Sequence, residues 1–304
     1  MTEQTKNQTQ TEMWRPSRPV VAASSTVIPG VLVVLGLFLV PLVVFAIYSF
    51  MTAGLYAVST PLTWDAYVSA LTSSANHRLA LNSLVVGLGT AVVTTAVGLP
   101  IAYFLRVAAG RWRLPILFLI TASMFASYLV RIYAWRSILG SNGLVNSSLR
   151  SLGVIDEPLT FLLYSRLAVT IALIHIFLPY VVLVLYAGTG PLGQGLIEAA
   201  RDLGAGSARL WARLIFPVMA APLATSFLFV FVLSASDYVT PQLLGGIGGS
   251  TLGVQIQANF ITVGNWPIAA ATSFLMLIAF VLCYLVSNLV LRWLGLSNLR
   301  FEST

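Results

Sequence analysis

The sequence predicts an all-α membrane protein, a polytopic bundle of six transmembrane helices. Of its 304 residues, 58% are hydrophobic and only 8% are charged, and the mean hydropathy is +0.91. A soluble domain carries about a quarter of charged residues, so this chain lacks the charge to cover a water-facing surface. Its apolar residues are also grouped into long runs, as membrane-spanning helices require.

Six apolar stretches reach the ~20 residues that a helix needs to cross the hydrocarbon core of a bilayer. They cover residues 27–50, 79–105, 114–135, 167–186, 217–239 and 268–291. Several prolines lie inside these runs, which a membrane tolerates where neighbouring helices satisfy the freed backbone groups. We therefore expect one transmembrane domain over residues 27–295, between a polar tail (1–26) and a short C-terminal tail (296–304).

The N-terminal tail is rich in Thr and Gln and is interrupted by Pro16 and Pro19. A segment of this composition cannot bury enough apolar surface to fold, so it is expected to be mostly disordered. The apolar run that follows is longer than the ~7–15-residue core of a cleavable signal peptide. We expect that run to remain as a membrane anchor.

The distribution of basic residues predicts the orientation of the chain. Eleven of the sixteen Lys and Arg residues fall in the N-terminal tail, in the loops after the second and fourth spans, or after the sixth span. Since cytoplasmic loops carry the excess of Lys and Arg, both termini are expected in the cytoplasm. The basic residues are scattered singly, so the net charge of +7 does not indicate a nucleic-acid partner.

The chain lacks the residue sets that common enzymes use. Its only lysine, Lys6, lies in the N-terminal tail, so the sequence has no Gly-x4-Gly-Lys-Ser/Thr phosphate-binding loop. His77 and His175 are too far apart for zinc-protease spacing. The single Cys283 excludes an intramolecular disulfide and a CxxC site. We therefore expect no catalytic, cofactor-binding or metal-binding residues on this chain.

The loop between the fourth and fifth predicted spans carries the most informative motif. Glu198 and Asp202 lie four residues apart and therefore share one face of a short amphipathic helix. Gly204 and Gly206 are expected to interrupt this helix. A second short helix should follow before Pro217 opens the fifth span. The small residues of such a loop would let a partner protein approach closely, and its carboxylates would accept hydrogen bonds.

In the spacing of its residues, this loop resembles the EAA loop of ABC importer permeases. The family pattern is Glu-Ala-Ala, three residues, Gly, nine residues and Ile-x-Leu-Pro, and this chain departs from it only by Leu214 for Ile and Phe216 for Leu. The resemblance implies that residues 190–217 form the coupling loop that docks into a groove on an ATPase subunit. The residues implied in coupling are Glu198, Ala199, Ala200, Asp202, Gly204 and Pro217.

Three further segments resemble the spermidine/putrescine branch of the binding-protein-dependent permeases. They are Asn82-Ser83-Leu84, Arg131-Ile132-Tyr133 and Trp266-Pro267, and the resemblance covers residues 27–295. It implies a type I ABC importer permease fold in a bacterial inner membrane, and a polyamine or related amine as the solute. It also implies a periplasmic solute-binding protein, a second permease in a heterodimer, and ATPase subunits that hold the ATP and magnesium, with no cofactor on this chain.

A few residues in or beside the spans are candidates for the translocation pathway. Asp237, next to Tyr238 at the outer end of the fifth span, would either attract an amine or mark a water-exposed helix end. His175, mid-span in the fourth helix, would pack or line a cavity. Arg131, in the third, would brace a loop or contact the solute. The aromatic candidates for a cation–π site, or else for packing, are Tyr133, Trp135, Tyr180 and Phe229.

Other functions stay open from the sequence alone. The loops expected outside carry more Arg than acidic residues, so the polyamine assignment depends on the resemblance, and related permeases serve opines, thiamine or ferric iron. A secondary transporter driven by an ion gradient would need carboxylates or broken helices near the bilayer midplane, whereas Asp237 lies at a helix end. A membrane-embedded enzyme or assembly factor would need a clustered acid–base or metal set, which the sequence does not suggest.

Overall fold

The computed structural model describes most of the chain. The described residues are 21–54, 57–59 and 61–293. Most of the predicted N-terminal tail (1–20) and the whole predicted C-terminal tail (296–304) lie outside them, so the predictions for those tails stay predictions. Residues 21–26, which were expected to belong to the N-terminal tail, are instead helical.

The chain divides into two compact units, Met1–Ile47 and Tyr48–Thr304. The first unit contains nearly all of helix α1 (Val21–Tyr48), which has Pro29 and Pro41 inside it. This helix begins six residues before the predicted first span. From Pro29 onwards its side chains are apolar on all sides, without a polar face, as in a helix that is surrounded by apolar groups.

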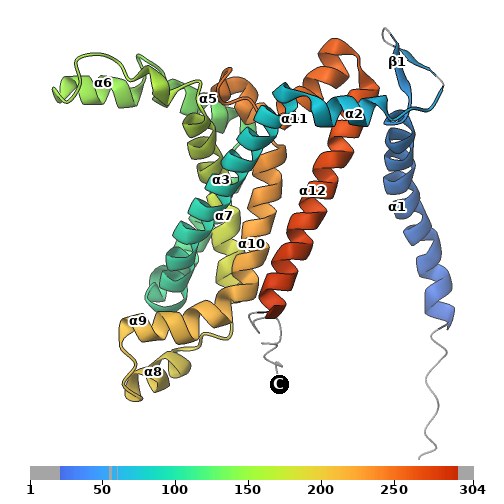
Figure 1. Cartoon of the computed structure of the whole chain (residues 1–304). Helices are drawn as coiled ribbons and strands as arrows, with labels where there is room; N and C mark the ends of the chain where they lie inside the picture. The colour runs from blue at the N-terminus through green and yellow to red at the C-terminus, as the bar shows by residue number, and fades with distance from the viewer. Residues whose placement is uncertain (1–20, 55–56, 60, 294–304) are drawn as a thin grey trace, which may run out of the picture. The chain divides into compact units, whose positions relative to one another are not determined.

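The second unit is built mainly of helices (Figure 1). Its long helices are α3 (Ser74–Val107), α7 (Arg166–Gly188), α10 (Phe216–Ser236) and α12 (Trp266–Trp293). Its shorter helices are α2 (Asp65–Thr72), α4 (Arg113–Met124), α5 (Tyr128–Leu139), α6 (Leu144–Ser151), α8 (Gln194–Asp202), α9 (Ser207–Leu210) and α11 (Leu252–Ala258). Short 3-10 turns occupy Gly110–Trp112 and Thr160–Leu162, and π-helical turns occupy Trp211–Ile215, Pro241–Gly245 and Asn259–Val263. Strands β1 (Thr52–Gly54) and β2 (Ala57–Ser59) pair antiparallel.

Five helical segments of the described chain are long and apolar enough to cross a membrane. They are Pro29–Tyr48, Ser74–Val107, Arg166–Gly188, Ser207–Ser236 and Trp266–Val290. They coincide with five of the six predicted spans. A sixth is reached if the bent pair Gly110–Met124 and Tyr128–Ser151 counts as one broken span. The predicted all-α membrane fold is confirmed.

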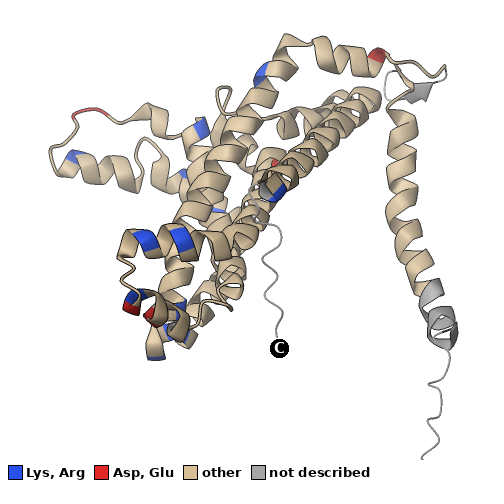
Figure 2. Cartoon of the chain, turned by 60° about the horizontal axis from the view of Figure 1, so that its bottom comes forward, with Lys and Arg blue, Asp and Glu red and all other residues tan. Residues whose placement is uncertain are grey.

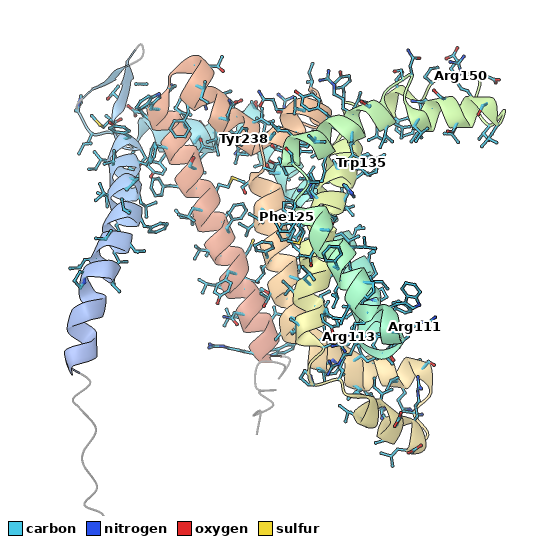
Figure 3. The ribbon with its side chains drawn as sticks, turned by 180° about the vertical axis from the view of Figure 1, so that it is seen from behind. Arg111, Arg113, Phe125, Trp135, Arg150 and Tyr238 are labelled. Carbon is cyan, nitrogen blue, oxygen red and sulfur yellow. The ribbon has the colours of Figure 1, made fainter. Side chains whose placement is uncertain are left out.

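The third predicted span is not the single straight helix expected over residues 114–135. α4 ends at Met124, α5 begins at Tyr128, and the two stretches are bent by 92°. The backbone tightens at the break, where the N–H of Phe125 bonds to the carbonyl of Ala122 at 3.1 Å. The hydroxyl groups of Thr121 and Ser123 also bond back to carbonyls of the preceding turn, an arrangement that bends helices. Figure 3 shows Phe125 at this break.

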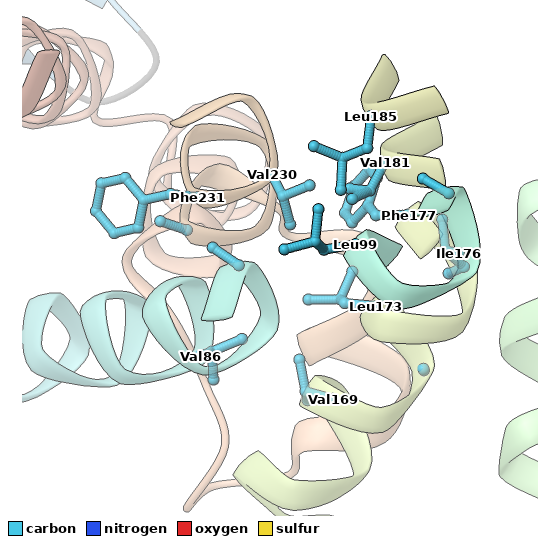
Figure 4. Packing of buried hydrophobic residues seen from close by; sticks show 14 of the residues in the cluster. Val86, Leu99, Val169, Leu173, Ile176, Phe177, Val181, Leu185, Val230 and Phe231 are labelled. Carbon is cyan, nitrogen blue, oxygen red and sulfur yellow. The ribbon is translucent and has the colours of Figure 1, made fainter. Parts of the chain in front are cut away.

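The core of the second unit lies where α3, α7 and α10 pack together (Figure 4). Small residues let these helices approach closely, as is common between membrane helices. A Cβ atom added at Gly87 of α3 would lie 2.8 Å from the Cβ of Ala235 on α10. A Cβ atom added at Gly98 would lie 2.7 Å from Val181 on α7. The central helix α3 is therefore fixed against both neighbours, and the functional loops project from the ends of this trio.

Candidate functional sites

The predicted coupling loop forms two short helices, α8 and α9, at one end of the second unit (Figure 1). α8 closes with the two hydrogen bonds of a Schellman motif, in which Ala205 donates to the carbonyl of Ala200 at 3.0 Å and Gly204 donates to that of Arg201 at 2.8 Å. Gly204 has a φ of +78°, a conformation that glycine adopts at low cost. The predicted interruption of the helix at the glycines is confirmed.

α8 presents an exposed surface that combines carboxylates with an apolar side chain. Leu192 and Ile197 are buried against the bundle and hold the helix in place. Glu198 and Asp202 are exposed, and Leu203 is 88% exposed. Two carboxylates and one large apolar side chain are therefore accessible to a partner protein on this surface.

Arg106, at the last turn of α3, ties the start of the coupling loop to the bundle. Its Nη2 donates to the carbonyl of Gly190 at 2.9 Å, and its Nε donates to that of Leu192 at 3.4 Å. The sequence interpretation used Arg106 only for orientation and missed this role. The sequence signal for this role of Arg106 is a single charged residue at the end of a long apolar span.

The second short helix and the fifth span form one continuous helical stretch, Ser207–Ser236, rather than the separate elements that were expected. The π-helical turn Trp211–Ile215 joins α9 to α10, and the N–H of Phe216 bonds to the carbonyl of Trp211. Pro217, which has no N–H to donate, is therefore tolerated at the start of α10 without breaking the helix. Trp211 also packs on Tyr103 of α3, with ring centroids 5.0 Å apart.

Asp237 serves as a backbone cap at the far end of α10. Its half-buried carboxylate accepts the N–H groups of Val239 at 3.2 Å and Thr240 at 3.1 Å. These N–H groups would otherwise be unpaired at the start of the turn Pro241–Gly245. The hydroxyl group of Thr240 in turn bonds to that of Tyr128 on α5 at 2.8 Å. The carboxylate is thus used to organise the chain between α10 and α11.

Tyr238 points to a hollow beside α10. It lines a cavity of about 470 Å³ together with residues of α11, α12 and the turn between them, among them Gln257, Phe260 and Met276. Tyr238 is 44% exposed, and Figure 3 shows it at the end of the unit opposite to Arg113. Of the predicted pathway residues, Tyr238 is the one that faces this cavity.

Arg131 and Trp135 of α5 pack against the middle of α7. Nη1 of Arg131 donates to the carbonyl of Ile176 at 3.5 Å, while its buried Nε has no hydrogen-bond partner among the described residues. The ring of Trp135 meets that of His175 edge-on, with centroids 5.8 Å apart. The contact with Ile176 is a bracing contact of the kind that the sequence suggested for Arg131.

The predicted aromatic residues do not gather into one ring cluster in this conformation. Tyr180 lies beside Phe177, with ring centroids 6.5 Å apart, while Tyr133 and Phe229 are both exposed. Within the described ranges, no ring contact joins two of the four candidates. Their assignment to a pathway stays a prediction.

Asn82 and Ser83, near the start of α3, hold the loop that precedes α11. Nδ2 of Asn82 donates to the carbonyls of Gly248 at 3.2 Å and Ser250 at 2.9 Å. Oγ of Ser83 accepts the N–H of Leu252 at 2.9 Å. Sequence reasoning singled out this pair by resemblance and assigned it no role. A polar pair at the beginning of an apolar span was the available signal.

Several curated membrane permeases are similar to this chain in sequence, although no protein-family model matches it. "Spermidine/putrescine transport system permease protein PotB" of Escherichia coli K12 is 33% identical over 206 residues, which cover 68% of this chain and 74% of the relative. PotB of Haemophilus influenzae is 29% identical over 236 residues, covering 77% and 82%. "Inner membrane ABC transporter permease protein YdcU" of Escherichia coli is 28% identical over 225 residues, covering 70% and 71%.

The fold is also found among solved structures. A chain of a bacterial ABC transporter that imports the acidic polysaccharide alginate superposes with a TM-score of 0.69, covering 90% of this chain and 95% of that one, at 16% identity. A second structure of that transporter, in complex with an alginate pentasaccharide-bound periplasmic protein, matches equally well. The helical arrangement described above is therefore that of an ABC importer subunit.

Proposed function

This chain belongs to the PotB family of ABC importer permeases, and we propose that it forms half of the translocation pathway for a polyamine or a related amine. It is a multi-pass membrane subunit and carries the transport function rather than an enzymatic one. Its PotB relatives are named for spermidine and putrescine, which supports an amine solute. Other permeases of this kind take different solutes, and the similarity to a putative 2-aminoethylphosphonate permease keeps a second amine within the proposal.

The coupling part of the proposal depends on one observation, the way α8 is mounted. Its exposed face offers Glu198, Asp202 and Leu203 to a partner. Arg106 links the loop to α3, and the unbroken stretch Ser207–Ser236 runs from α9 through α10. A displacement of α8 would therefore be carried directly into two helices of the core. In this proposal, an ATPase subunit that binds ATP and magnesium docks on α8 and moves these helices between two states.

The remaining partners follow from the proposed orientation. With the excess of basic residues in the cytoplasm, α8 and α9 face the ATPase, and the opposite end, with α6 and α11, faces the periplasm. A periplasmic binding protein would deliver the solute to that end, and a second permease would complete the pathway as a heterodimer. The proposed pathway includes Tyr238, which faces the cavity described above. The other proposed pathway residues are Asp237, His175, Tyr133, Tyr180 and Phe229.

Reconstitution tests this function. The chain is purified with its ATPase, second permease and binding protein and placed in proteoliposomes, and uptake of labelled spermidine, putrescine, 2-aminoethylphosphonate and thiamine is measured with and without ATP. We expect ATP-dependent uptake of an amine. Uptake that persists without the ATPase and follows an imposed ion gradient would contradict the ABC importer function. ATP-dependent uptake of thiamine alone would contradict the proposed amine solute and would still be consistent with coupling to an ATPase.

A further inference from the structure

A basic cavity lies at the end of the second unit that carries α8. It has a volume of about 360 Å³ and is lined by Leu105, Arg106, Val107, Gly110, Arg113 and Gly193. Its walls come from the last turn of α3, the start of α4 and the residue before α8. Figure 3 shows Arg111 and Arg113 at this end, and Figure 2 shows that basic and acidic residues lie together at this end.

The two arginines of this cavity carry unneutralised charge. Arg106 uses Nε and one N–H of Nη2 on carbonyl oxygens, so part of its five-donor fork stays free. Arg113 stacks over the ring of Tyr186, with Cζ 5.7 Å from the ring centroid. Neither contacts a carboxylate of the described residues, and both are partly buried. Two half-buried guanidinium groups without an acid are a site for an anion, and guanidinium binds phosphate in a two-point geometry.

An exposed apolar stripe begins where the cavity ends. Leu114 and Phe118 of α4 are 71% and 72% exposed and lie four residues apart, on one face of the helix. Phe125, at the break that follows α4, is 86% exposed and continues this face. α4 has 12 residues, which is about 18 Å at the rise of an α-helix. One leaflet of the hydrocarbon core is about 15 Å deep, so the stripe has the length of one acyl chain.

We propose that this cavity and stripe bind one anionic phospholipid, with its phosphate headgroup on Arg106 and Arg113 and an acyl chain along α4. A phospholipid fits both parts, because it joins a phosphate to an apolar chain of this length. A soluble phosphate would contact only the arginines, whereas a phospholipid can contact the stripe of Leu114, Phe118 and Phe125 at the same time. The exposed Trp112 beside the cavity is placed as an interfacial aromatic would be. The inference is independent of the transported solute.

The consequence concerns the coupling loop. The headgroup would lie between Arg113 and the backbone of Gly193, directly before α8. Arg106 would bind the lipid through its free N–H groups, while its Nε and Nη2 bonds to the carbonyls of Leu192 and Gly190 hold the coupling loop. The lipid would therefore stabilise the position from which α8 meets its partner.

Native mass spectrometry of the full-length chain tests the site. The purified protein is incubated with equal amounts of dioleoyl phosphatidylglycerol and dioleoyl phosphatidylcholine, and the lipid retained is counted for the wild type, Arg113→Gln and Arg209→Gln. Arg209 is an exposed arginine of α9 at the same end of the unit and outside the cavity, so its variant removes the same charge. We expect preferential retention of phosphatidylglycerol, a loss of roughly fivefold in Arg113→Gln, and no change in Arg209→Gln.

Two further measurements distinguish a lipid headgroup from a free phosphate in the cavity, and a lipid from a protein subunit on the stripe. Inorganic phosphate and glycerol phosphate are added at the same concentration, and thermal unfolding is followed with each. Stabilisation by the diacyl lipid alone supports the proposal, whereas equal stabilisation by inorganic phosphate makes the cavity an ion site and overturns it. Equal retention of both lipids, or equal loss in both variants, also overturns it. Displacement of phosphatidylglycerol by the second permease would assign the stripe to a subunit interface instead.

Discussion

The N–H of Gly204 donates to the carbonyl of Arg201 at 2.8 Å, and this bond closes α8 at the residue where the chain turns left-handed. A Cβ atom at Gly204 would meet no other atom within 4 Å. The requirement for glycine at this position of the coupling loop is therefore conformational, because space for a larger side chain is available. Of the two explanations that the sequence offered, a backbone bend and close approach of a partner protein, the structure shows the bend.

Gly204→Ala should destabilise the bend by about 1–2 kcal/mol, since a left-handed φ costs a residue with a Cβ this much. α8 would fray at its C-terminal end, and ATP-driven uptake should fall while membrane insertion persists. Gly206→Ala is the matched control, because Gly206 has a φ of −67° and open space around it. Uptake and stimulated ATPase activity of both variants are measured in proteoliposomes. Equal loss in both would show that the loop tolerates no added side chain, whatever its φ.

Glu198→Arg should weaken docking of the ATPase at least about tenfold, because a fixed acceptor on the exposed face of α8 becomes a cation. Pull-down of the purified ATPase by the permease measures this directly, beside stimulation of its activity by loaded binding protein. Arg201→Glu on the same helix serves as a charge-reversal control of opposite sign. Undiminished pull-down by Glu198→Arg would mean that α8 is a linker and not a docking surface.

Cysteine labelling tests the orientation. Ile247 is 100% exposed in the loop before α11, and Leu203 is 88% exposed at the bend after α8. In a Cys283→Ser background, Ile247→Cys should react with a membrane-impermeant maleimide in intact cells, and Leu203→Cys should react only after the membrane is opened. The reverse pattern would place both termini outside and would remove α8 from any cytoplasmic ATPase.

The spans and the coupling bend could be predicted because their signals are local in the sequence. A run of apolar residues specifies a membrane helix wherever it lies, and a glycine two residues after Asp202 is a sufficient signal for a helix end. The break after Met124 gave no such signal, because the apolar run continues through residues 114–135. It depends on where α5 packs on α7, as in the contacts of Arg131 with Ile176 and of Trp135 with His175.

The roles of individual polar residues could not be predicted from the sequence, because they also depend on contacts between distant parts of the chain. Arg106 and Gly190 are 84 positions apart, and Asn82 and Ser250 are 168 apart. No spacing rule relates such pairs, so sequence reasoning could name the residues and not their partners. Asp237 is the opposite case. Its partners are two and three residues away, and an Asp directly after a helix could have been recognised as a cap.

Ser83→Ala should cost about 1–3 kcal/mol, because it leaves the buried N–H of Leu252 without its acceptor. Thermal unfolding of the purified chain measures this cost. Hydrogen exchange of residues 246–252 should rise at the same time, since this loop loses one of its ties to α3. Thr121→Ala is a suitable control, because its exposed hydroxyl bonds only within α4. Unchanged exchange in Ser83→Ala would show that Asn82 alone holds the loop.

Variants of Asp237 can distinguish a structural role, as a backbone cap, from a role in attracting the amine. If the carboxylate is a cap, Asp237→Asn should keep the KM of amine uptake near that of the wild type, because an amide oxygen can still accept one of the N–H groups of Val239 and Thr240. Asp237→Ala should then lower the stability by about 1 kcal/mol and reduce uptake. If the carboxylate attracts the amine, the loss of charge in both variants should raise KM by a similar factor. The hydrogen bonds at 3.2 and 3.1 Å favour the cap, so we expect the two variants to differ. Pull-down of the ATPase should be normal in both, since Asp237 lies at the end of α10 that is remote from α8.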